Sequence, residues 1–261
     1  MSRRLTLAEQ VLHHLGVADP EEIDLEAIAW HLGAQIRYRA LHSCEARLIG
    51  RGDRAIITVD ERKDARRQRF SIGHELGHWR HHRGRCLICR SEDIGNLGRS
   101  ATDPERVADS YASDLLLPRY LLDPLLRKVP KPTLAAVRAV ASRFEASLTA
   151  TLIKVVESDR FPMLIVCHEA EKPRWRWFGR SASAEPWFPK DELDPESPAF
   201  ALLYGPGPDE QRAPSKTGAD AWFDRRGAEE FEMLEQSYRL PGRHIVSVLT
   251  LADPKMLDVG G

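Results

Sequence analysis

The chain has 261 residues, of which 42% are hydrophobic, and its 38 Lys and Arg residues almost balance its 39 Asp and Glu residues. A net charge of -1 excludes a generally polycationic nucleic-acid binder. The apolar runs are too short to span a bilayer, and the first residues lack the apolar core of a secretory signal. Four cysteines are too few for a disulfide scaffold, so we expect a cytoplasmic protein.

In the first 130 residues, the spacing of apolar residues is helical, then strand-like, then helical again. Asp24 is placed to cap the second helix, and Asp103 with Pro104 forms a typical start for the fourth. The expected helices are 5–15, 24–32, 64–82 and 104–117. The expected strands are 35–40, 45–50 and 54–60.

Beyond residue 130, two short helices with a tight turn precede a region of strand-like composition. The expected helices are 133–144, 147–157 and 227–238. The expected strands are 163–168, 174–179, 200–204 and 244–251, with loops at 186–198 and 205–218. We therefore predict an α+β protein in three parts: a small mixed α/β domain over 1–130, a helical connector resembling a helix-turn-helix over 131–160, and an α+β region over 161–261.

The strongest chemical signal is HELGH at positions 74–78, within the helix expected at 64–82. His74 and His78 are four residues apart, so both imidazoles lie on one helical face and can bind a single Zn²⁺. Glu75 projects beside that ion, where it can take a proton from water. This pattern predicts a hydrolytic zinc site.

A candidate third ligand, Glu105, lies on the next expected helix. Two histidines and one carboxylate leave a fourth position for water, which is the catalytic arrangement of zinc. Asp109, one turn later, can accept the free ring N–H of a zinc-bound histidine. As an alternative, Thr102 and Glu105 fit a capping box that needs no metal; the presence of HELGH favours the metal.

Two segments, RFSIGHELGHW at 69–79 and ERVADSYASDLLLP at 105–118, resemble the ImmA/IrrE family of metallopeptidases. DLEAIA at 24–29 and RAIITVD at 54–60 look like the helix and strand that precede the motif in that family. The resemblance covers residues 5–118 well and the connector loosely. It implies a zincin-like fold with a gluzincin-like site.

By this resemblance, His74, His78 and Glu105 match the zinc ligands, and Glu75 matches the general base. Asp109 departs from the Asn of many members, but either side chain can hydrogen-bond a histidine. The family also implies limited cleavage of a helix-turn-helix repressor that controls stress or mobile-element genes. Mn²⁺ could replace Zn²⁺ in cells.

Weaker signals follow the motif. His82 is the nearest candidate donor to a tetrahedral oxyanion, although a solvated helix end is the favoured interpretation. Cys86 and Cys89 form a lone C-x-x-C, which suits a redox switch or a zinc site, but loop packing is favoured. Basic residues around the motif could favour an acidic protein substrate.

The connector would offer only Thr149, Thr151 and Lys154 to DNA, without the Arg, Asn or Gln that make bidentate base contacts. Direct DNA binding is therefore disfavoured. In the last region, strand alternation places Trp175 and Trp177 on one core-facing side. This region could be sensory or could dock the substrate.

We therefore predict a zinc endopeptidase whose partner is a helix-turn-helix repressor. The alternative is a catalytically silent zinc-containing regulator that acts by binding its repressor partner or DNA. Glu75 disfavours this alternative, because a purely structural site requires no base.

Overall fold

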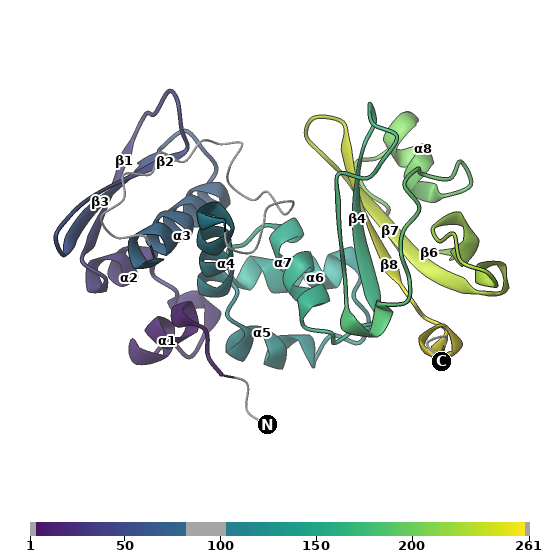
Figure 1. The fold of residues 1–261 in the computed structure, drawn as a ribbon, viewed down its shortest axis with the longest axis horizontal. Helices are drawn as coiled ribbons and strands as arrows, with labels where there is room; N and C mark the ends of the chain where they lie inside the picture. The colour runs from purple at the N-terminus through teal and green to yellow at the C-terminus, as the bar shows by residue number, and fades with distance from the viewer. Residues whose placement is uncertain (1–3, 82–102, 259–261) are drawn as a thin grey trace. The chain divides into compact units, whose positions relative to one another are not determined.

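The computed structural model describes residues 4–81 and 103–258, and the chain divides into two compact units (Figure 1). The first unit comprises Met1–Leu125 and Val140–Ser147; the second comprises Leu126–Ala139 and Leu148–Gly261. Each unit contains its own sheet with helices packed on it, which confirms the α+β class. None of the helices in the described part of the chain combines the length and hydropathy that crossing a bilayer requires.

Helices α1 (Leu7–His14) and α2 (Leu25–His31) open the first unit with local capping signals. Thr6 and Glu9 form a reciprocal capping box at α1. Asp24 accepts hydrogen bonds from two backbone N–H groups at the start of α2, as predicted.

The sheet of the first unit has the strand order β1-β3-β2. Its strands are β1 (Ala34–Arg39), β2 (Ala46–Arg51) and β3 (Arg54–Asp60), close to the predicted ranges. β1 runs parallel to β3, and β2 is antiparallel to it. One face buries small and branched side chains such as Leu48 and Ile57, and helix α3 (Ala65–His81) packs against β2 and β3.

The hairpin of β2 and β3 places Arg51 directly opposite Arg54. Like charges at directly opposed positions destabilise a sheet. We therefore expect Arg51→Glu to raise the free energy of unfolding by about 0.2–1 kcal/mol in urea denaturation. Arg47→Glu is the matched control, because Arg47 lies opposite Thr58; an equal gain there would contradict the pairwise explanation.

Two long helices follow: α3 (Ala65–His81) and α4 (Pro104–Leu116). Asp103 caps α4, and Pro104 occupies its first turn, as predicted. The sequence pattern did not predict α5 (Arg119–Leu126), which contains a proline. Tertiary contacts stabilise α5, because the buried carboxylate of Glu9 accepts the Arg119 N–H at 2.8 Å.

The predicted helix pair corresponds to α6 (Leu134–Arg143) and α7 (Leu148–Glu157). The strands of the second unit are β4 (Met163–Glu169), β5 (Trp177–Arg180), β6 (Ser215–Gly218), β7 (Glu232–Leu240) and β8 (His244–Thr250). They form one antiparallel sheet of order β5-β4-β8-β7-β6. Helix α7 packs on β4 and β5, and α8 (Pro198–Tyr204) packs on β7 and β8. Short 3-10 helices span Pro20–Glu22, Ala182–Ala184, Ala219–Ala221, Ala228–Glu230 and Pro254–Leu257.

Three sequence predictions in this unit are wrong. The strand expected at 200–204 is helix α8, which Ser197 caps and Pro198 begins. The helix expected at 227–238 is mostly strand β7, because pairing with β6 and β8 overrides the helical propensity of its Glu-rich sequence. The loop expected at 205–218 ends in β6.

The two tryptophans expected on one strand face do not share a strand. Trp175 precedes β5, which begins at Trp177. Trp175 and Phe178 are partly buried against the core of this unit, and their ring centroids lie 4.7 Å apart. The centre of that core contains the fully buried Trp187.

Candidate metal centre

Helices α3 and α4 pack closely because glycine and alanine lie at their contact. A Cβ atom at Gly77 would lie 2.8 Å from the Cα of Ala108, and one at Gly73 would lie 3.1 Å from the Cβ of Ala112. The sequence reasoning missed these glycines, although their four-residue spacing on a helix is a visible signal of close approach. This packing brings the HELGH turn of α3 against the first turns of α4.

Three predicted ligands converge at this contact. The Nε2 atoms of His74 and His78 lie 3.0 Å apart. Glu105 places one carboxylate oxygen 3.2 Å from His74 Nε2 and the other 3.4 Å from His78 Nε2. In the described part of the chain, this is the group of His, Cys, Asp and Glu side chains that is close enough to hold a metal ion.

The spacing of these atoms fits a small divalent cation. Zn²⁺ with tetrahedral bonds of about 2.0–2.1 Å requires its ligand atoms to be about 3.3 Å apart. The observed separations of 3.0, 3.2 and 3.4 Å lie on both sides of that value. Two imidazole nitrogens and a carboxylate suit Zn²⁺ and also other first-row ions, so the residues indicate a metal site without fixing the metal.

Asp109 contacts the outer ring nitrogen of His74, as predicted. Its Oδ1 atom lies 2.8 Å from His74 Nδ1. With a metal ion bound at Nε2, a proton held on Nδ1 by Asp109 would fix the orientation and the tautomer of the His74 ring.

Electrostatics in the cluster favour a cation. Burial lowers the pKa of His74, but hydrogen bonds to Asp109 and Glu105 and the charge of Glu75 raise it to about 9. Hydrogen bonds from His74 and His78 hold the pKa of Glu105 well below its usual range, against the opposing effect of burial. Negative charge thus gathers around two imidazoles in a buried site.

We expect Asp109→Ala to weaken metal binding by about 10- to 100-fold, because His74 loses the group that orients its ring. Competition with a chromogenic chelator measures this change. Asp109→Asn supplies an amide oxygen to the same nitrogen and should retain most of the affinity. An Ala variant that binds metal as tightly as the parent would show that the contact is dispensable.

Of the remaining predicted site residues, the structure describes Glu75. Glu75 is fully buried on α3, next in sequence to His74. His82, Cys86 and Cys89 lie outside the described residues.

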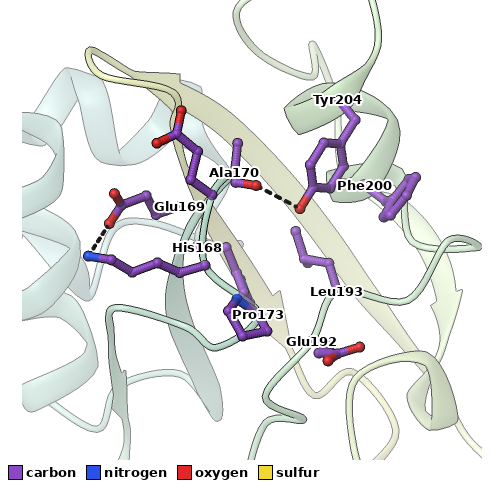
Figure 2. Close-up of a pocket in the computed structure, with 10 residues that line it drawn as sticks. His168, Glu169, Ala170, Pro173, Glu192, Leu193, Phe200 and Tyr204 are labelled. Carbon is purple, nitrogen blue, oxygen red and sulfur yellow. Dashed lines mark hydrogen bonds and ion pairs between the residues drawn. The ribbon is translucent and has the colours of Figure 1, made fainter.

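A separate hollow of about 310 Å³ lies in the second unit. Figure 2 shows that its lining comes from the end of β4, the segment after it, the loop with Glu192 and Leu193, and one side of α8. Burial lowers the pKa of His168 to about 4, and its Nε2 lies 3.2 Å from the Asp191 carbonyl oxygen. Tyr204 donates a hydrogen bond to the Ala170 carbonyl oxygen (Figure 2). The lining contains no member of the metal-binding cluster.

Comparison with known proteins connects the cluster to a family. Residues 29–155 match the family described as the IrrE N-terminal-like domain, a peptidase family. No curated protein matches this chain. Among solved structures, a Mycobacterium tuberculosis transcriptional regulator matches with a TM-score of 0.58 at 13% identity, covering 93% of this chain and 74% of that one. That likeness concerns the fold. Since the matched segment contains the whole His74, His78 and Glu105 cluster, residues 29–155 form a metallopeptidase-like domain of the IrrE N-terminal type, which supports the assignment to the ImmA/IrrE family.

Proposed function

We propose that this protein is a zinc-dependent endopeptidase that makes a limited cut in a protein substrate. The observation that carries the proposal is the convergence of His74, His78 and Glu105 beside a buried Glu75. A structural zinc site is typically closed by four protein ligands, whereas the three ligands that converge in the described part of the chain leave one position for water or substrate. The family match supports a peptidase.

Each side chain has a role in this mechanism. Zn²⁺ bound by the three ligands would acidify water and polarise the scissile carbonyl. Glu75 takes the proton from the attacking water and delivers it to the leaving nitrogen. Asp109 holds the His74 ring in the orientation that binding requires.

The substrate class that we propose is a helix-turn-helix repressor of stress or mobile-element genes. The family resemblance of the motif segments supports this class, and the solved protein of similar fold is itself named a transcriptional regulator. The cytoplasm is the compartment where such a repressor acts. Because that solved protein is named a regulator, a second candidate function is that this protein binds its repressor partner without cutting it.

The test is a cleavage assay with a helix-turn-helix repressor encoded beside this protein. The protein is incubated with the repressor after loading with Zn²⁺, after loading with Mn²⁺ and after chelation, and the products are identified by gel electrophoresis and mass spectrometry. We expect defined fragments from the metal-loaded protein and none after chelation. A stable complex with an intact repressor would support the regulator instead, and cleavage that chelation leaves unchanged would contradict a metallopeptidase.

A further inference from the structure

The solvent side of the first unit's sheet carries an array of basic side chains. Strand register places Arg37 and Arg47 on the two sides of Thr58 in one row across the sheet. At the hairpin end of the same side, Arg51 lies opposite Arg54. We call this surface the arginine face, defined by five exposed residues: Arg37, Arg39, Arg47, Arg51 and Arg54.

None of the five arginines has an ion-pair partner in the described part of the chain, whereas nearby basic residues do: Arg62 pairs with Asp60, and Lys63 and Arg67 pair with Glu45. Asp60 lies opposite Arg39 in the sheet but pairs with Arg62. Like charges at opposed sheet positions reduce stability. The opposed pair Arg51 and Arg54 therefore adds repulsion to the sheet, which an anionic partner would compensate.

The arginine face has an apolar centre. Ile49 and Ile56 are directly opposed in β2 and β3, in the row between the two arginine rows. Ile49 is 57% exposed and Ile56 is partly exposed. Successive rows on one face of a sheet are about 6.6–6.8 Å apart, so one bound segment can reach all three rows.

This pattern fits a protein partner better than a nucleic acid. Protein interfaces combine an apolar centre with a polar rim, and Arg is enriched in them. Single-stranded nucleic acids are bound by aromatic side chains on which bases stack, and this side of the three strands has none. The opposed isoleucines would contribute little to binding a phosphate backbone.

We propose that the arginine face docks an acidic amphipathic segment of a partner protein. Carboxylates of that segment pair with the arginines, and its apolar side chains cover Ile49 and Ile56. The opposite side of the sheet packs on α3, where Gly50 approaches Trp79. A segment docked on the outer side therefore does not cover the metal-binding cluster, and its docking does not depend on hydrolysis.

The test measures binding by fluorescence anisotropy. The probe is a labelled helical peptide with one face of leucines flanked by glutamates, and its reference carries lysines in place of the glutamates. The face variant combines three substitutions in the arginine face: Arg37→Gln, Arg47→Gln and Arg54→Gln. The control variant makes the same change at three exposed arginines elsewhere: Arg66, Arg212 and Arg226. Circular dichroism melts verify that both variants are folded.

We expect the parent and the control variant to bind the acidic peptide equally and the lysine peptide not at all. The face variant should bind about tenfold more weakly, since three exposed ion pairs are lost. Ile49→Ser should weaken binding about fivefold through the apolar centre, and added salt should weaken the parent's binding.

Other results would overturn the proposal. Equal losses in the control and face variants would show a non-specific charge effect. Unchanged binding in the Ile49→Ser variant would show that the bound segment makes no apolar contact with Ile49, and would contradict an amphipathic partner. Tighter binding of single-stranded or duplex DNA, lost in the face variant, would identify a nucleic acid instead. No binding of the peptide by the parent would reject the docking surface. Since only binding is measured, none of these outcomes bears on the peptidase proposal.

Discussion

Replacement of Glu75 by Gln is expected to slow cleavage of the protein substrate by about 10²–10⁴-fold, the usual contribution of a general base. The amide has nearly the same shape as the carboxylate but cannot accept the proton of the attacking water. His74, His78 and Glu105 are unchanged in this variant, so metal content should stay at the parent level. Single-turnover cleavage rates and metal analysis of the same preparations measure the two properties.

The control for this variant is Glu61→Gln, which makes the same chemical change at an exposed position of the first unit. It should cut at the parent rate. Parent-level cleavage by Glu75→Gln would contradict the general-base assignment. Loss of metal together with cleavage would instead show that Glu75 supports the site and does not only transfer protons.

Replacement of Gly77 by Val is expected to lower the free energy of unfolding by about 1–3 kcal/mol, the usual effect of overpacking. Even the Cβ atom of this side chain would meet the Cα of Ala108 at 2.8 Å and its carbonyl oxygen at 2.9 Å, and backbone atoms cannot rotate away. Val has a better helix propensity than Gly, so the loss can come only from the contact between α3 and α4. Parting these helices also separates His78 from Glu105, and metal binding should weaken.

Urea denaturation of the metal-free protein and chelator competition measure these two effects separately. Gly207→Val is the matched control, because a Cβ atom there meets no atom within 4 Å. Its stability should change by less than about 0.5 kcal/mol. Unchanged stability of Gly77→Val would show that α3 and α4 can move apart freely, and the close contact would then not position the ligands.

The sequence predicted much of the first unit because its signals are local. Asp24 and Asp103 cap helices with hydrogen bonds to residues two or three positions away, so the helix starts are visible in a short window. The HELGH pentapeptide places two imidazoles on one helical face through the helical repeat alone. Glu105 and Asp109 could be proposed because they lie one turn apart on a second helix, where side chains four residues apart face the same direction.

Errors occurred where long-range pairing determined the structure. The segment of β7 has a helix-forming composition, and only its neighbours β6 and β8 hold it as a strand. Helix α5 contains Pro124 and lacked a clear local pattern, yet contacts with α1 stabilise it.

The sequence by itself therefore determined the α+β class, most elements of the first unit and the residue types of a metal site. Only the tertiary structure decided that His74, His78 and Glu105 converge, because close packing at Gly73 and Gly77 sets the distance between two helices. It also decided that arginines from three strands share one face, since strand order and register depend on hydrogen bonds between distant segments. Local periodicity fixes which way a side chain points along its own element, whereas packing fixes its neighbours.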